Sequence, residues 1–152
     1  MLVVIAEKEE LKLVEELGYG DNPILITGVG GINVINSLKD IPKDTEILNI
    51  GYVGSNILPI GTIVYVDQVH TQHEIANFKE PNYFASGIYK LGYECCDCYT
   101  STDFVTKTNK KEKCVFDMEL AFIRALFNNA RAIKVVSDNL NKKEYNNKIK
   151  GE

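Results

Sequence analysis

Carboxylates stand at the ends of two successive apolar runs in this sequence. The run 115–119 (VFDME) carries Asp117 and Glu119, and Asp138 follows Ser137 at the end of the next apolar run. In open α/β sheets, ligands bind at the carboxyl ends of the strands, so we expect these acids to face one crevice. A carboxyl group in such a crevice can act as a general acid or base.

The elements around these acids predict an α/β protein. Residues 120–129 carry apolar side chains at helical spacing, so we expect strand, helix and strand with a right-handed crossover that leaves the two strands parallel. Further strands are predicted over 2–6, 23–27, 46–50, 61–69, 93–100 and 114–117. Helices are predicted over 7–17 and from the glycine segment 28–31 through Leu38, with Pro42 closing the second helix. Residues 70–86 predict a long loop, and loops of that length are often functional.

Composition places limits on the partners. The chain has 152 residues, 45% of them hydrophobic and 25% charged, with a net charge of −4, which fits one globular domain. We expect that domain to span 1–140 and the polar stretch 141–152 to be a frayed tail. The acidic balance gives no reason to expect nucleic acid or an anionic membrane as a partner. No apolar run predicts a membrane span and no secretion signal is visible, so we expect a cytoplasmic protein.

Two glycine-rich segments follow predicted strands. Gly28, Gly30 and Gly31 follow one strand, and Gly51 and Gly54 follow another. Small residues at such positions let the backbone approach a ligand, and exposed N–H groups suit an anion or a sugar hydroxyl. Tight turns explain the same glycines without any ligand, so both interpretations stay open.

The four cysteines allow a second kind of site. Cys95, Cys96 and Cys98 lie close together, with Cys114 downstream. Neighbours on a strand point to opposite faces, so Cys95 and Cys96 could bind one zinc ion only across a bulge or turn. We therefore expect free thiols and no metal or cofactor, and keep a metal or redox module as an alternative.

Seven segments occur together in one order along the chain. They are 6–10 (AEKEE), 27–30 (TGVG), 49–54 (NIGYVG), 61–64 (GTIV), 101–105 (STDFV), 117–119 (DME) and 137–138 (SD). In this order the chain, over residues 1 to about 140, resembles the purine nucleoside and uridine phosphorylase superfamily, and most closely its methylthioadenosine/S-adenosylhomocysteine nucleosidase branch. The resemblance implies a three-layer αβα fold with a mixed, mostly parallel sheet, in a shortened form.

The resemblance also implies catalytic roles. Glu10 matches the carboxylate that helps to activate the attacking water, and Asp138 matches the acid that protonates purine N7. Glu119 matches the acid that holds the ribose hydroxyls. Taken singly, Glu10 would suit a solvated helix face and Asp138 a cap. Asp138 must carry a proton near neutral pH, which requires burial or a nearby carboxylate such as Glu119.

Substrate contacts follow from the same resemblance. Phe104 matches the aromatic that stacks on the base, and Val105 the position whose backbone reads the base edge. Met118, otherwise plain core, lies under the sugar, and Lys134 stands where those enzymes carry an arginine beside the acids. The predicted substrate-binding set is Phe104, Val105, Met118, Asp117, Gly28, Gly51, Tyr52, Gly54 and Lys134.

The basic residues favour hydrolysis over phosphorolysis. Phosphorylases of this superfamily hold phosphate with arginines, whose planar fork matches the oxyanion. This chain has only Arg124 and Arg131, on or just past the helix after Glu119 and away from the glycine segments. Lys8 is the one basic residue near Glu10. We therefore predict water as the nucleophile and a purine nucleoside as the substrate, with a phosphate-dependent phosphorylase as an alternative.

Two departures from the family pattern affect these expectations. Tyr52 replaces a small residue, and its ring could fill the substrate space, so a non-catalytic nucleoside-binding protein is a further alternative. The chain is also shorter than typical members, and lost helices leave sheet faces uncovered. We therefore expect a homo-oligomer, a dimer or larger. The resemblance implies that a neighbour's loop closes the 5′ end of the pocket, and 77–85 is our candidate for that loop.

Overall fold

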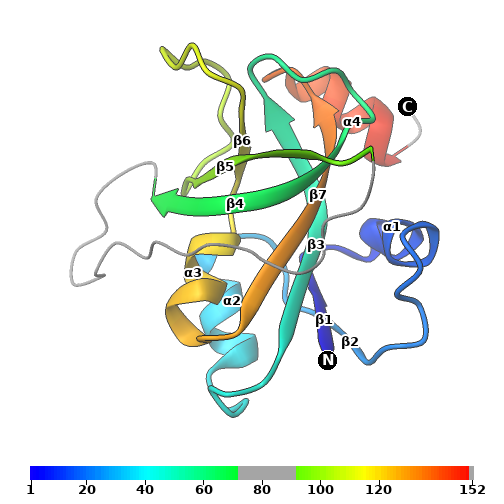
Figure 1. Cartoon of the computed structure of the whole chain (residues 1–152), viewed down its shortest axis with the longest axis vertical. Coiled ribbons are helices and arrows are strands. Elements are labelled where there is room, and N and C mark those ends of the chain that lie inside the picture. The colour runs from blue at the N-terminus through cyan, green and yellow to red at the C-terminus, as the bar shows by residue number, and fades with distance from the viewer. Residues whose placement is uncertain (72–91, 151–152) are drawn as a thin grey trace.

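The computed structural model describes residues 1–71 and 92–150 (Figure 1). The predicted loop 70–86, with its candidate segment 77–85, therefore lies almost wholly outside the described residues. The strands are β1 Leu2–Ile5, β2 Ile24–Ile26, β3 Ile47–Ser55, β4 Ile63–Thr71, β5 Glu94–Thr100, β6 Cys114–Asp117 and β7 Ala130–Asp138. The helices are α1 Leu11–Glu16, α2 Gly31–Leu38, α3 Leu120–Leu126 and α4 Lys142–Lys150, and a 3₁₀ turn over Lys8–Glu10 precedes α1.

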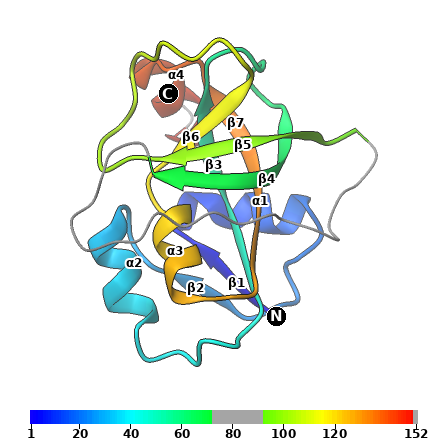
Figure 2. The same ribbon diagram turned by 60° about the vertical axis from the view of Figure 1, so that its left-hand side comes forward.

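The strands form a mixed sheet that partly closes on itself. Its order is β2-β1-β3-β6-β5-β4-β7, and β3 also pairs with β7, which closes the last five strands into a barrel. Two of the pairings, β3 with β6 and β4 with β7, are antiparallel, and the remaining pairings between described strands are parallel. The α/β class is thus confirmed, but the expected simple three-layer sandwich is corrected by the barrel, visible in Figure 2 where β4 and β5 cross β3 and β7.

Three apolar clusters hold the elements in place. One fills the interior of the barrel formed by strands β3 to β7 and includes Val66, Cys98 and Val136. A second packs α1 and the end of α4 against β1 and β3, and a third packs α2 and α3 against the other side of β1 and β3. Helices therefore cover both faces of the β1–β3 half, as an amphipathic α/β pattern requires.

The unit formed by β6, α3 and β7 differs from the prediction. We expected two parallel strands joined by a right-handed crossover. Instead β3 lies between them, antiparallel to β6 and parallel to β7. The crossover rule applies to parallel strands of one sheet, so it does not govern this connection.

The two glycine segments have different conformations. Gly28 and Gly30 have φ values of 90° and 91°, so the first segment is a turn of the kind that glycine favours. Gly51 and Gly54 lie inside β3, which runs on to Ser55, so the predicted second turn is wrong. Glycine is needed at these positions because there is no room for a side chain. A Cβ atom at Gly51 would lie 2.8 Å from Glu10 Oε2, and one at Gly54 would lie 2.9 Å from Asp138 Oδ2.

The end of the chain is ordered where a frayed tail was expected. Residues 142–150 form α4, which packs against β7, and Ile149 is buried in the cluster with α1. A buried apolar residue in a polar stretch is a weak sequence signal, which is why composition alone suggested disorder. Among the described residues, no helix has the length and apolar character needed to cross a membrane.

Candidate active site

A small pocket lies where β1, β3, the β6–α3 turn, β7 and α4 meet. Its cavity volume is about 70 Å³, and a second hollow of about 30 Å³ adjoins it. The residues that line the first are Ala6, Glu7, Glu10, Val29, Tyr52, Val53, Gly54, Phe104, Phe116, Asp117, Met118, Glu119, Asp138 and Tyr145. The three predicted catalytic acids therefore reach one pocket, although Glu10 lies more than 100 residues before the other two in the sequence.

Glu10 is fixed by backbone donors on both carboxyl oxygens. Its Oε1 accepts hydrogen bonds from the N–H groups of Ala6 and Glu7, at 2.9 and 3.1 Å. Its Oε2 accepts one from Tyr52 N–H, at 2.7 Å. Burial raises the pKa of Glu10, while Lys134 and the backbone donors oppose the rise. Glu10 is thus a buried carboxyl group in one orientation, which places its basicity closer to neutral pH than that of an exposed glutamate.

Glu119 is held by the turn before α2. Its Oε2 accepts a hydrogen bond from the Gly30 N–H at 2.8 Å. Burial, with a further contribution from the neighbouring Asp117, raises the pKa of Glu119 to about 8. At neutral pH its carboxyl group therefore carries a proton and can both donate and accept hydrogen bonds.

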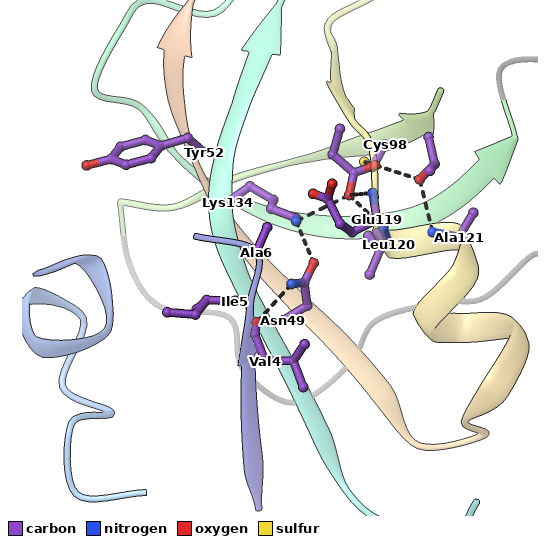
Figure 3. A network of polar contacts seen from close by, with 12 residues as sticks. Val4, Ile5, Ala6, Asn49, Tyr52, Cys98, Glu119, Leu120, Ala121 and Lys134 are labelled. Atoms are coloured by element: carbon purple, nitrogen blue, oxygen red, sulfur yellow. Dashed lines mark hydrogen bonds and ion pairs between the residues drawn. The ribbon is translucent and has the colours of Figure 1, made fainter. Parts of the chain in front are cut away.

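Lys134 stands behind the pocket in a buried polar network (Figure 3). Its Nζ donates to Asn49 Oδ1 at 2.5 Å and to Asp117 Oδ2 at 3.3 Å. Burial alone would lower the pKa of Lys134, but Asp117 and other acids outweigh it and raise the pKa, so the ammonium stays charged. The sequence placed Lys134 beside the acids, and the structure does so. It does not line the pocket, however, so its contacts are to protein groups.

Asp117 is almost fully engaged by protein donors. Its Oδ1 accepts from Thr100 Oγ1 at 2.5 Å and Cys98 Sγ at 3.3 Å. Its Oδ2 accepts from the Leu120 N–H at 2.7 Å as well as from Lys134. Asp117 was predicted to bind substrate. Although it lines the pocket, these bonds make it a group that fixes the start of α3 and neutralises Lys134.

Asp138 lies at the end of β7 and is fully buried. Ser137 Oγ donates to its Oδ1 at 2.8 Å, and the Leu140 N–H donates to its Oδ2 at 2.9 Å. Burial raises the pKa of Asp138, and Glu144 adds a smaller contribution of the same sign. The expected proton-holding tendency is present, but its source is burial and not Glu119.

The remaining predicted residues differ in whether they line the two hollows. Phe104 and Met118 line both hollows, and Val105 lines the smaller one. Gly51 sits against Glu10 and Lys134, behind the lining. Gly28 does not line either hollow and lies in the turn that carries Gly30.

The Tyr52 ring does not plug the pocket. It packs in the apolar cluster with α1, and Lys12 Nζ lies 5.9 Å from the ring centre. Figure 3 shows the ring directed away from Lys134. Its backbone N–H, which holds Glu10, is its contribution to the site.

Sequence reasoning missed several residues of the site. Asn49 had a signal, because an amide inside the apolar run EILNI must find a buried partner. Thr100 and Cys98, which bond Asp117, had none beyond their place on a strand. Glu7 and Tyr145 line the pocket and share a hydrogen bond of 2.9 Å between Tyr145 OH and Glu7 Oε2. Tyr145 lies in a stretch that composition predicted to be a tail.

The cysteines form no metal centre in the described part of the chain. Cys96, Cys98 and Cys114 are buried and Cys95 is half-buried, and all four are free thiols. Within residues 1–71 and 92–150, no three His, Cys, Asp or Glu side chains are grouped to hold a metal ion. The metal alternative therefore has no support from these residues.

The fold matches that of solved nucleosidases. The sequence matches no protein-family model and no curated protein. A 5′-methylthioadenosine/S-adenosylhomocysteine nucleosidase from Neisseria meningitidis, in complex with methylthio-immucillin-A, superposes with a TM-score of 0.75 at 15% identity, over 98% of this chain and 91% of that one.

Two further structures match as well. The nucleosidase from S. pneumoniae with the transition-state inhibitor MT-ImmA gives a TM-score of 0.75 at 16% identity, over 97% of this chain and 90% of that one. An MTAN variant from Chlamydia trachomatis bound to MTA gives 0.75 at 16% identity, over 98% and 89%. The resemblance indicated by the sequence motifs is confirmed at the level of structure: this chain has the fold of the 5′-methylthioadenosine/S-adenosylhomocysteine nucleosidases.

Proposed function

We propose that this protein is a nucleoside N-ribosyl hydrolase that cleaves the glycosidic bond of an adenosine-type purine nucleoside. The observation that carries the proposal is the convergence of Glu10, Glu119 and Asp138 on one pocket that also contains the Phe104 ring. The fold shared with the nucleosidases supports the same reaction class.

The base is activated by Asp138. As the glycosidic bond stretches, the leaving purine gains electrons, and a proton from Asp138 to N7 neutralises them. The buried position of Asp138 supports this role, because it raises the pKa and favours the protonated acid. Phe104, which lines both hollows, stacks on the purine ring, and Val105 presents its backbone to the base edge.

The sugar is held and attacked from the other side of the pocket. N-glycoside cleavage passes through an oxocarbenium-like sugar, whose developing positive charge is stabilised by an ionised carboxylate such as that of Glu10. Glu119 holds the ribose hydroxyls and Met118 lies under the ring. Glu10, whose orientation is fixed by three backbone N–H groups, accepts the proton of the attacking water.

Water is a better nucleophile here than phosphate. Among the described residues, no Lys or Arg lines either hollow. Arg124 donates to the Phe127 carbonyl and Arg131 pairs with Glu46 at 3.4 Å, both away from the pocket. Lys8 is exposed and is not a lining residue. A phosphate dianion would therefore lack the basic partners that phosphorylases provide.

We also retain the proposal that the protein is a homo-oligomer. Ile26, Val29 and Ile32 are 47%, 40% and 78% exposed, although they are large apolar side chains close in sequence. Large apolar side chains that are exposed together are typical of an interface. Light scattering is expected to give at least twice the chain mass, and Ile32→Glu to reduce it. A monomeric wild type at micromolar concentration would contradict this.

A nucleoside panel tests the reaction. Purified protein is incubated with adenosine, methylthioadenosine, S-adenosylhomocysteine and inosine, with and without phosphate, and free base and sugar are measured. We expect free base and the free sugar, which keeps its 5′ substituent, with rates independent of phosphate. Ribose 1-phosphate that appears only with phosphate would establish the phosphorylase instead. Nucleoside binding in calorimetry without any base release would establish a binding protein.

A further inference from the structure

Two polar groups of the pocket have no part in the proposed reaction. Tyr145, from α4, donates its hydroxyl to Glu7 Oε2 at 2.9 Å, and both residues line the larger hollow. The Tyr145 ring also meets the Phe104 ring edge-on, with centroids 5.4 Å apart. A carboxylate and a phenol thus face the same space as the predicted catalytic acids.

The two hollows differ in the residues that line them. The smaller hollow contains Asp103 and Val105, which do not line the larger one. The larger hollow contains Glu7, Glu10 and Glu119, which do not line the smaller one. Phe104 and Asp138 line both. A base that meets Val105 and Asp138 therefore occupies the smaller hollow, and the sugar occupies the larger one.

Each substituent of the sugar then needs a partner in the larger hollow. The 2′ and 3′ hydroxyls face Glu119, and the anomeric carbon faces the water held by Glu10. The substituent left is the one at the 5′ carbon. The polar pair left among the lining residues is Glu7 with Tyr145.

We propose that the Glu7–Tyr145 pair selects nucleosides whose 5′ group donates a hydrogen bond, a hydroxyl or an amine, over nucleosides with a 5′-alkylthio group. This inference rests on the proposed function, because it takes the positions of base and sugar from it. It assigns the 5′ specificity to two residues that lie 138 positions apart and are joined by one hydrogen bond.

The reason is the cost of leaving a desolvated acceptor without a donor. A 5′ hydroxyl or ammonium that displaces or extends the Tyr145 contact supplies Glu7 with a new donor. A methylthio group has no donor hydrogen, so its entry would bury the carboxylate against sulfur and carbon. A hydrogen bond to a charged group is typically worth about 10- to 100-fold. Sites built to bond a substrate hydroxyl reject analogues that lack it.

The present cavity is consistent with a pocket that substrate must open. Its volume of about 70 Å³ is small beside the roughly 300–1,000 Å³ typical of ligand sites. Tyr145 lines it and contacts Glu7 and Phe104. A 5′ group that enters the larger hollow therefore meets a space bounded by Tyr145 and Glu7.

The test compares four nucleosides that differ only at the 5′ position. The values of kcat/KM are measured for adenosine, 5′-amino-5′-deoxyadenosine, 5′-deoxyadenosine and methylthioadenosine. We expect adenosine and the amine to exceed methylthioadenosine and 5′-deoxyadenosine by about 10-fold or more. Since 5′-deoxyadenosine is the smallest of the four, its low value would separate hydrogen bonding from size.

Variants assign the effect to the pair. Glu7→Leu is expected to reduce the ratio of adenosine to methylthioadenosine about 10-fold, and Tyr145→Phe to reduce it by a smaller factor. Glu9→Leu lies in the same turn and is not a lining residue, and Tyr19→Phe removes a hydroxyl elsewhere. Both controls should keep the wild-type ratio. A ratio depends little on the amount of folded enzyme, so partial misfolding of a variant does not mimic the result.

Three outcomes overturn the inference. The first is methylthioadenosine cleaved as efficiently as adenosine by the wild type. The second is an unchanged ratio in Glu7→Leu. If no nucleoside is cleaved, calorimetry with the same four compounds decides: a preference for the hydroxyl and amine supports the inference while the proposed hydrolase fails. Equal binding, or no binding of any of the four, overturns both.

Discussion

Two hollows on this molecule differ in size and in chemistry. The candidate active-site pocket has a volume of about 70 Å³, whereas an outer groove beside β5 has about 580 Å³. The outer groove is lined by Asp67, Cys95, Cys96, Asp97, Tyr99, Lys110, Lys111, Glu112, Lys113 and Cys114. It is the larger space and contains more charged groups, yet the smaller pocket is where the groups suited to catalysis lie.

The difference is what burial does to charge. In the outer groove Lys113 pairs with Glu94 at 2.9 Å, and both side chains are about half exposed to water. Burial raises the pKa of Cys96 to about 12 and that of Cys114 to about 11, so these thiols stay protonated and unreactive. In the candidate active-site pocket, burial moves the pKa of carboxyl groups toward neutral pH, the range that suits a general acid or base.

The largest expected contrast comes from replacing one aspartate in each place. Asp138→Asn keeps an acceptor for the Leu140 N–H but cannot protonate the leaving base. We expect kcat to fall by about 10²–10⁴-fold, with adenine binding in calorimetry changed far less. Asp97→Asn, in the outer groove, removes the negative charge that faces His70 Nε2 at 3.1 Å and should change kcat by no more than about twofold.

Equal losses of kcat in Asp138→Asn and Asp97→Asn would contradict the proposal that only the smaller pocket contains catalytic groups. A full loss of adenine binding in Asp138→Asn, together with a cooperative unfolding transition like that of wild type, would show that Asp138 binds the base without acting as the acid.

A second contrast uses two lysines. Lys134→Met leaves Asp117 and Asn49 without their buried cation, and removing one partner of a buried pair typically costs about 3–5 kcal/mol. The free energy of unfolding, measured by urea denaturation, should fall by that order. Lys113→Met breaks a pair that water already solvates, so its unfolding midpoint should stay close to wild type.

A Lys134→Met protein as stable as wild type would contradict this prediction, because it would mean that the buried contacts of Lys134 with Asp117 and Asn49 make no net contribution to the free energy of unfolding.

Much of the fold could be predicted because its signals are local. The spacing of apolar residues and the positions of glycines predict the turn at Gly28 and Gly30, the strands that precede it and the helix that follows it. Glu119 and Asp138 could also be placed, because each follows the end of a predicted strand. Glu10 lies one turn inside a predicted helix, and only the family resemblance singled it out. The local sequence pattern predicts elements reliably where one element follows another within a few residues.

The rest depended on pairings between distant segments. Closure of the barrel by β3 and β7 leaves no mark in either strand, so an open sheet was the natural expectation. The glycines of β3 looked like a turn because their cause, room for Glu10 and Asp138, lies elsewhere in the chain. Tyr145 lies in a polar stretch, and its position in the pocket depends on contacts with distant residues, a hydrogen bond to Glu7 and a ring contact with Phe104.

A third prediction concerns those β3 glycines. A Cβ atom at Gly51 would lie 2.8 Å from Glu10 Oε2 and 3.4 Å from Lys134 Nζ. Gly51→Ala therefore forces Glu10 to move, and a displacement of about 1 Å at a catalytic group can cost up to about 10²-fold. We expect kcat to fall within that range while the protein still binds adenine. Unchanged kcat would mean that Glu10 is not held in a required position.

The smallest predicted effect is on the pH dependence of stability. The pKa of Glu119 is about 8 in the folded protein and about 4.5 without burial. Between these values the folded state keeps a proton that the unfolded state has released, so the free energy of unfolding decreases as pH rises and levels off above about pH 8. Glu10 and Asp138, whose pKa values are also raised, add to the same decrease.

Glu119→Gln removes the titrating group but keeps an oxygen for the Gly30 N–H, so its free energy of unfolding should decrease less steeply between pH 5 and pH 8. Urea denaturation at several pH values measures this slope. Glu94→Gln, in the water-exposed pair with Lys113, is the matched control and should keep the wild-type slope. If the two variants give the same slope, Glu119 does not hold its proton in the folded protein. Burial would then fail to separate the small pocket from the outer groove.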